Sequence, residues 1–155
     1  MTSDGISTED WEVVHDYAVK IANAACADDH ASSDILTMKL LRYLDSLESK
    51  YGKRASILAT KADYESDQIL RVSLLEQAHE IARHSGDREN LTFTSSSLAR
   101  LYVEESVDIP AAQKWLALLA DALGNKWDDL EYQEFQDLTV QIENLKRQEK
   151  PDTLA

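Results

Sequence analysis

The sequence predicts an all-α protein made of stacked helical hairpins, and three observations lead to this fold class. Apolar residues recur at the three- and four-residue steps of a helix face over most of the chain. Only two prolines and four glycines interrupt its 155 residues, of which 43% are apolar. No segment shows the alternation of a strand, and each predicted helix is too short to be stable without packing on its neighbours.

The first two helices are expected over about 8–27 and 34–50. Ser7-Thr8-Glu9-Asp10 has the pattern of a capping box, and we expect residues 1–7 to form a loose terminus. The mostly polar stretch 28–33 is typical of a turn between two helices. On the second helix, the residues expected to face inward are Ile35, Met38, Leu41, Leu44 and Leu47.

The third and fourth helices are expected over about 54–65 and 68–84, with Ser66-Asp67 between them. Leucines, an isoleucine and alanines recur on one face of the fourth helix. This helix should end at Gly86, because glycine readily adopts the left-handed conformation of a helix end.

The last three helices are expected over about 88–105, 110–123 and 128–148. Pro110 suits the first turn of a helix, where its missing N–H would be unpaired anyway. Asp128 and Glu131 form a second capping pair. The polar side of the last helix is typical of a helix that caps the end of a stack. Its inward residues are expected to be Leu130, Phe135, Leu138, Ile142 and Leu145.

The residues Leu98-Ala99-x-x-Tyr102, followed by Ala111, Trp115 and Leu118, resemble a tetratricopeptide (TPR) repeat. In that family a small residue on the first helix of each pair lets the second helix approach, and large residues on the second helix fill the remaining space. The resemblance implies that Ala99 is the small residue and that Trp115 fills the space.

The same pattern recurs upstream in three sets of aligned residues. The sets are Ala25, Ala59 and Ala99; Leu41, Leu75 and Trp115; and Leu44, Ala78 and Leu118. All three sets have intervals of 34 and then 40 residues. Departures from the family pattern include Asp28 in place of the tyrosine, Arg71 in place of the second alanine, and the absence of the usual first-helix glycine. An ordinary helical bundle with coincident alanines is the alternative.

The resemblance therefore implies one domain over 1–155, in which about three TPR-like hairpins form a right-handed α-α superhelix. The expected units are about 8–51, 52–87 and 88–125, with a capping helix at about 128–148.

The formal net charge of −13 disfavours nucleic acid and anionic membranes as partners, because both attract basic proteins. Such a charge usually means a solvated exterior, although attraction to a basic partner is the alternative. Cys26 is the single cysteine, so no internal disulfide can form. Met1 is followed by a polar stretch instead of the apolar segment of a signal peptide, and we expect a cytoplasmic location.

Catalytic and metal-binding patterns are missing from the sequence. His15, His30, His79 and His84 do not form a metal-binding pair, and we expect them on the surface or in turns. No serine stands in a nucleophile motif and no glycine-rich phosphate loop is present. The sequence therefore predicts a protein that is not an enzyme and that needs no cofactor or metal.

In TPR proteins the first helices of successive pairs line a concave groove that holds a peptide or helix of a partner. The resemblance places six candidate binding residues in that groove: Lys53, Tyr64, Phe93, Ser96, Arg100 and Gln136. Aromatic residues and arginine often dominate binding energies at interfaces. Alternatively, Phe93 belongs to the core and Arg100 pairs with a neighbour such as Glu104.

The predicted function is thus protein–protein interaction. A dedicated chaperone or assembly factor, a self-associating scaffold that forms a homodimer, and an acidic inhibitor of a basic site are the alternatives.

Overall fold

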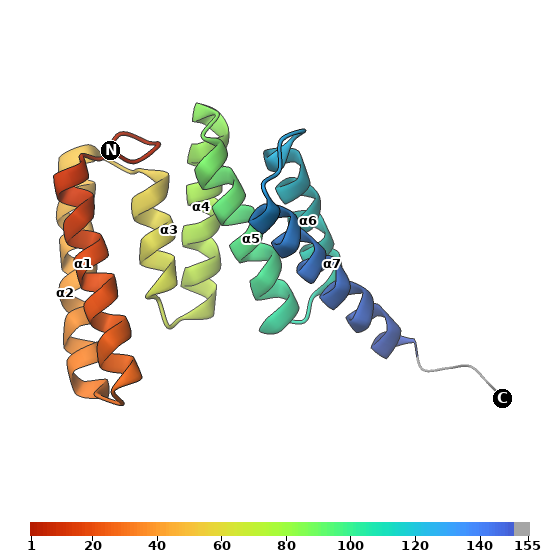
Figure 1. Cartoon of the computed structure of the whole chain (residues 1–155), viewed down its shortest axis with the longest axis horizontal. Helices are drawn as coiled ribbons and strands as arrows, with labels where there is room; N and C mark the ends of the chain where they lie inside the picture. The colour runs from red at the N-terminus through yellow and green to blue at the C-terminus, as the bar shows by residue number, and fades with distance from the viewer. Residues whose placement is uncertain (151–155) are drawn as a thin grey trace. The chain divides into compact units, whose positions relative to one another are not determined.

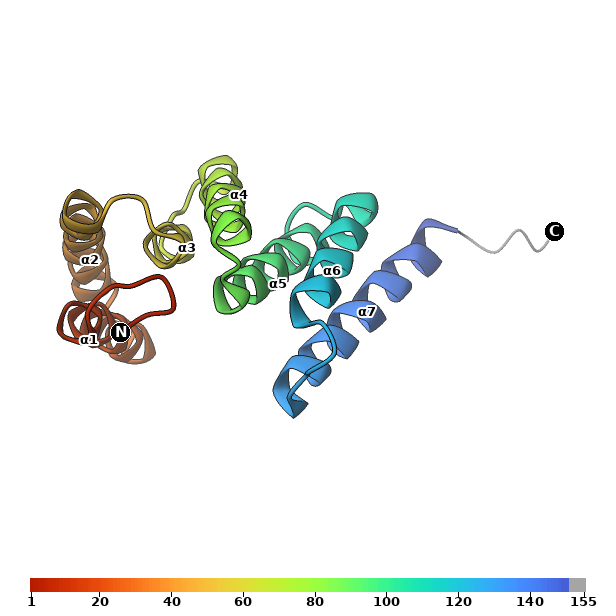
Figure 2. The same cartoon turned by 90° about the horizontal axis from the view of Figure 1, so that it is seen from above.

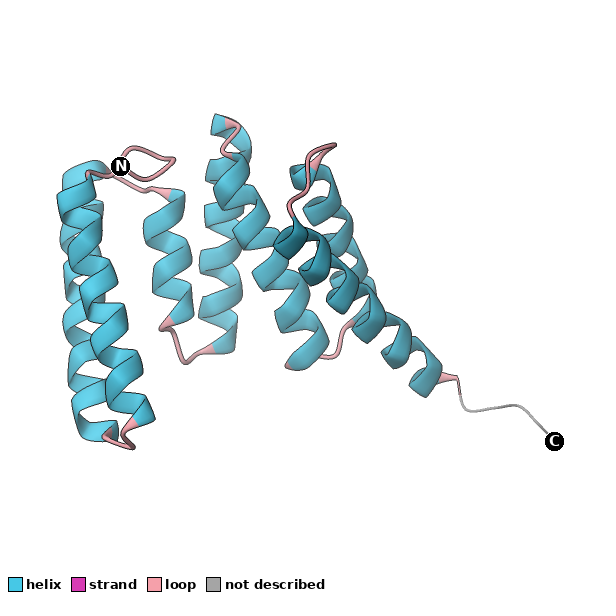
Figure 3. Cartoon of the chain, viewed as in Figure 1, coloured by secondary structure: helices cyan, strands magenta, loops and turns pink. Residues whose placement is uncertain are grey.

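The computed structural model describes residues 1–150, and these residues form seven α-helices and no strand (Figures 1 and 3). The all-α prediction is therefore confirmed for this range; residues 151–155, which the sequence predicts to fray, lie outside it. The helices are α1 (Thr8–Cys26), α2 (His30–Tyr51), α3 (Ala55–Asp63), α4 (Gln68–Ser85), α5 (Arg88–Glu104), α6 (Ile109–Leu123) and α7 (Asp129–Glu149).

The chain divides into two compact units, Met1–Asp87 and Arg88–Ala155. In the first unit α1 packs on α2, α2 contacts α3, and α3 packs on α4. In the second unit α5, α6 and α7 contact one another. Consecutive helices thus pair within each unit. Figure 2 shows this for α1 with α2 and for α5 with α6. The single superhelical domain stays a prediction.

Local capping residues explain most helix ends. Asp128 and Glu131 form the predicted capping box at the start of α7, with each side chain bonded to the other residue's backbone N–H. Gly86 ends α4 in the left-handed region, at φ 68°. The α2 helix begins at His30, four residues before the prediction, because the Asp29 carboxylate accepts a hydrogen bond from the Ser32 N–H at 3.1 Å. This cap turns most of the predicted 28–33 turn into helix.

The N-terminal residues are fixed, so the predicted loose terminus is wrong. Ile6 is fully buried in the apolar core of the first unit. The Asp4 carboxylate accepts hydrogen bonds from the N–H and the hydroxyl of Ser56, both at 2.8 Å, in the first turn of α3. Arg54, which precedes α3, provides no side-chain cap of its own. A remote residue therefore supplies the cap that the local sequence lacks.

An apolar core cluster lies within each unit. The cluster of the first unit contains Ile6, Val14, Ile21, Leu40, Leu44, Leu47 and Ile57. A core cluster of the second unit contains Val103, Ile109, Ala112 and Ile142. These residues come from every helix of the second unit, so α7 belongs to its core and does not merely flank it.

Several predicted inward residues are exposed, and these predictions are corrected. Ile35 and Met38 are each 54% exposed on α2. Their predicted stripe advanced by three residues at each step, which turns it by about 60° around the helix each time. Only the last members of the predicted stripe therefore reach the face that packs on α1. Nearer the start of α2, Leu36 and Leu40 lie on that face in place of Ile35 and Met38.

Two further positions differ from the prediction. Leu130 is 82% exposed at the start of α7, ahead of the turns in which Leu138 and Ile142 are buried. Among the aligned small residues, Ala59 and Ala99 are buried but Ala25 is exposed. The role expected for Ala25, as a close-packing residue, is therefore wrong.

Candidate partner-binding site

Two of the six predicted binding residues lie in the first unit. Lys53 is exposed in the connection between α2 and α3. Tyr64 follows the last residue of α3 and is half-buried against the core of that unit. Burial raises the pKa of the Tyr64 hydroxyl, and the neighbouring Asp63 adds to the shift. Tyr64 thus contributes to packing, while Lys53 remains accessible.

The other four residues lie in the second unit, on α5 and α7. Phe93 is 42% exposed, and Arg100 and Gln136 are also exposed. Ser96 is buried. The Ser96 hydroxyl and Arg100 both donate to Oε1 of Glu134, with a distance of 2.6 Å from Nη2 of Arg100. Arg100 therefore pairs with Glu134 on α7, and not with Glu104 as the alternative interpretation expected.

A second arginine connects α5 to α7 in the same way. The Arg88 guanidinium donates to both carboxylate oxygens of Glu131, at 3.0 and 3.1 Å, and to the Lys126 carbonyl at 2.8 Å. Arg88 first, and then the backbone of Asp128, lower the pKa of the Glu131 carboxyl. Sequence reasoning missed both glutamates, because no local pattern indicates which distant arginine a surface glutamate will meet.

A groove of about 240 Å³ lies between α6 and α7 in the second unit. Its apolar walls are Leu116 and Ala117 on α6 and Phe135 and Ile142 on α7. Gln113, Thr139, Glu143 and Lys146 complete the lining. Ala117 is exposed and Leu116 and Phe135 are half-buried, so the apolar surface is accessible from outside. None of the six predicted binding residues lines this groove.

Aromatic side chains continue this surface toward the start of α7. The Trp127 ring meets the Phe135 ring edge-on with centroids 4.9 Å apart, and its centroid is 6.3 Å from that of Tyr132. The Trp127 indole N–H donates to the Gly124 carbonyl at 2.6 Å, which fixes the ring. Phe135 belongs to both features, and so the groove and the aromatic cluster form a continuous apolar surface.

The charges around the groove differ between the two ends of α7. Between Trp127 and Leu145 the sequence has six carboxylates and no lysine or arginine. Beyond that stretch come Lys146 and Arg147, and Lys146 pairs with Glu143 at 2.8 Å. The first half of α7 is therefore strongly acidic, and its last turn is basic.

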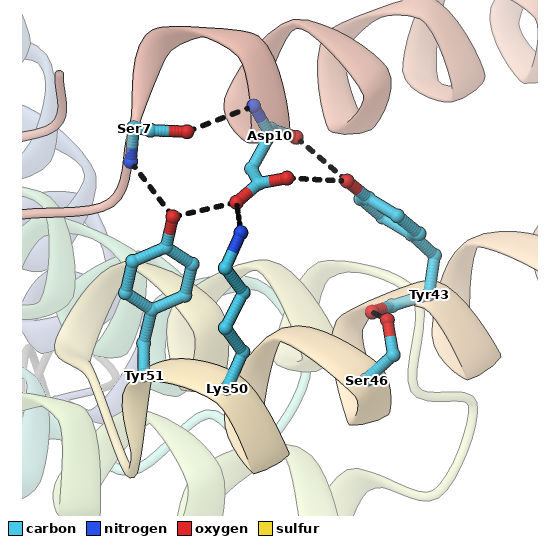
Figure 4. A network of polar contacts seen from close by, with 6 residues as sticks. All are labelled: Ser7, Asp10, Tyr43, Ser46, Lys50 and Tyr51. Carbon is cyan, nitrogen blue, oxygen red and sulfur yellow. Dashed lines mark hydrogen bonds and ion pairs between the residues drawn. The ribbon is translucent and has the colours of Figure 1, made fainter.

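A polar network in the first unit joins α1 to α2 (Figure 4). The Asp10 carboxylate accepts hydrogen bonds from Lys50 at 2.7 Å, Tyr51 at 2.5 Å and Tyr43 at 3.3 Å. The bonds from Lys50 and then Tyr51 lower the pKa of Asp10 to about 2. Asp10 thus does not complete the predicted capping box, although Ser7 does cap α1. Every polar atom of the carboxylate is engaged within the chain, which indicates a structural role.

Asp63 has an unusual environment for a surface carboxylate. Asp63 is the last residue of α3, and the residue as a whole is exposed to solvent. The surrounding protein atoms nevertheless desolvate the carboxyl group and raise its pKa to about 6, against the opposing effect of Arg71. The negative end of the helix dipole acts in the same direction as desolvation.

Within residues 1–150, no three or more His, Cys, Asp or Glu side chains come together in a way that could hold a metal ion. In the same range no helix combines the length and the apolar character needed to cross a membrane. His79 is buried on α4, so the expectation that all four histidines lie on the surface or in turns is wrong for this residue.

Comparison with known proteins gives no match to a family model, to a curated protein or to a solved structure.

Proposed function

We propose that this protein is a non-catalytic interaction module, built from TPR-like helical hairpins, that binds a helix or peptide of a partner protein. The observation that carries the proposal is the apolar groove between α6 and α7. An accessible apolar surface bordered by polar residues is one form that an interaction site takes. The accompanying aromatic residues are the types that contribute most to binding energy at interfaces.

This proposal moves the binding site from the predicted groove to the surface formed by α6 and α7. Ser96 and Arg100 already have a partner in Glu134, so a ligand would have to break that contact in order to use them. Phe93 and Gln136 stay candidates for peripheral contacts, because both are exposed.

Site-specific photo-cross-linking tests the proposal. A benzophenone amino acid is placed at Ala117 in the groove, and at the exposed Asn144 outside it as a matched control. In cells of the native host we expect a discrete protein adduct from Ala117 and none from Asn144. Substituting Phe135→Ala should weaken the Ala117 adduct. The same adducts from both positions, or no adduct from Ala117, would overturn the proposal.

Self-association is a second candidate, and the exposed pair Ile35 and Met38 on α2 favours it. These residues lie one turn apart, and so they form a small apolar ridge that a second copy could cover. Light scattering across a wide concentration range tests this candidate. We expect the Ile35→Lys, Met38→Lys double variant to remain monomeric at concentrations where the parent forms dimers; a monomeric parent would remove the candidate.

A further inference from the structure

We infer that the groove between α6 and α7 accepts an amphipathic helix with a basic flank, and that the basic residues of this helix lie toward the Phe135 end. The inference rests on the proposed function and specifies the chemistry of the partner.

The size of the groove favours protruding side chains over a small molecule. Pockets for small ligands usually measure about 300–1,000 Å³, whereas this groove has about 240 Å³ and is open to solvent. Its α7 wall extends from Phe135 to Lys146. That length is about three helical turns, or about 16 Å. A row of aliphatic side chains from a partner would fit along it.

The groove also favours a helix over an extended peptide. Many extended peptides gain affinity by adding to the edge of a sheet, where main-chain hydrogen bonds form. Both walls of this groove are helices, whose backbone groups are already bonded internally. A helix instead presents side chains every three or four residues on one face, which suits a groove between two helices. The small side chain of Ala117 on the rim permits a partner helix to approach closely.

The charge of the partner follows from the carboxylates of the second unit. Six of them lie between Trp127 and Leu145, with no basic residue among them. Glu131 and Glu134 are paired with arginines, but Asp129 and, on α6, Asp121 are exposed. These carboxylates would therefore attract a basic side chain near Phe135. The face of the exposed Tyr132 ring would attract the same cation. At the other end Glu143 is already paired with Lys146 at 2.8 Å, and Arg147 follows, so that end attracts a basic side chain less.

A second copy of the chain is a poorer occupant by the same reasoning. Two copies would each carry a net charge of −13, and their repulsion opposes association. A cationic helix from another protein gains both the apolar contact and the long-range attraction.

Selection from a displayed library of helical peptides with randomised surface residues tests the inference. The bait is the full chain at about 0.15 M salt, where distant charges are screened. Ala117→Trp fills the groove without changing the charge, and Asn144→Trp adds the same side chain outside the groove. We expect the enriched helices to carry an apolar stripe with lysine or arginine beside one end. Their affinity should fall at least about tenfold with Ala117→Trp and stay within about twofold with Asn144→Trp.

The outcomes separate the inference from the function on which it rests. Helices that need the groove but show no preference for basic residues would overturn the charge inference and leave the interaction module intact. Binders that tolerate Ala117→Trp, or no enrichment at all, would overturn both. Moving the basic residues to the other end of an enriched helix should weaken its binding to the chain. Unchanged affinity would refute the proposed orientation.

Discussion

Asp4 caps the first turn of α3 from a position 52 residues earlier in the chain, through two hydrogen bonds to Ser56. The contact joins the N-terminal segment to the second hairpin of the first unit. Since Ile6 is fully buried in the same segment, the first seven residues are part of the folded structure.

Replacing this cap should destabilise the first unit. We expect Asp4→Ala to lower the free energy of unfolding by about 1 kcal/mol, the usual effect of losing a helix cap. Urea unfolding followed by circular dichroism measures the change. Arg54→Asp would provide a local cap at the start of α3, and so it should restore much of the loss in the Asp4→Ala background. An Asp4→Ala variant as stable as the parent would contradict the capping role.

The register of α2 can be tested with two alanine substitutions on the same helix. Leu40 is fully buried and Ile35 is 54% exposed. Leu40→Ala should cost about 2–4 kcal/mol of stability, whereas Ile35→Ala should change it by no more than about 0.5 kcal/mol. Equal losses of stability in the two variants, measured by urea unfolding, would show that the buried face of α2 is assigned wrongly.

Asp10 should make stability depend on pH at the acidic end. Lys50 and Tyr51 lower its pKa to about 2 in the folded protein, below the value of about 3.9 expected for an unfolded chain. The ionised carboxylate therefore stabilises the fold, fully above the unfolded pKa, and this stabilisation is lost as the pH falls toward 2. Asp10→Asn should lower the melting temperature near neutral pH, and the difference from the parent should shrink below about pH 4.

The matched control for Asp10 is Asp16→Asn on the same helix, where the carboxylate forms only an exposed ion pair with Lys20. This variant should melt close to the parent at all pH values. Equal effects of the two substitutions would show that the network around Asp10 has no special role.

Asp63 should have the opposite pH dependence. Desolvation raises its pKa to about 6, so the folded state binds the proton more tightly than the unfolded chain does. The ionised Asp63 carboxylate therefore lowers the stability of the fold. This loss is absent below the unfolded pKa of about 4, grows as the pH rises, and levels off above about 6. Asp63→Asn should therefore raise the melting temperature at about pH 7.5 and leave it unchanged near pH 3.5. Glu76→Gln, at an exposed site on α4, is the control.

The helices themselves could be predicted because their signals are local. Ser7, Asp67, Asp108 and Asp128 each accept a hydrogen bond from a residue two or three positions later. Gly86 adopts its left-handed conformation at the expected end of α4. Such signals involve residues within one turn, so the amino-acid sequence alone contains them.

The candidate site was less predictable, because it depends on distances between residues far apart in the chain. The repeat pattern pointed to Arg100 as a binding residue, but Glu134 lies close enough to bind it. The groove combines Ala117 and Phe135 from two helices, and no spacing within either helix indicates it.

The sequence by itself determined the number, type and approximate ends of the helices in the described range, because caps and apolar periodicity act within a few residues. Only the tertiary structure decided that Asp4 would cap α3, that Ile35 and Met38 would stay exposed, and that α6 and α7 would leave an apolar groove open. These outcomes depend on which helix faces meet, and many faces of an amphipathic helix satisfy the same pattern almost equally well.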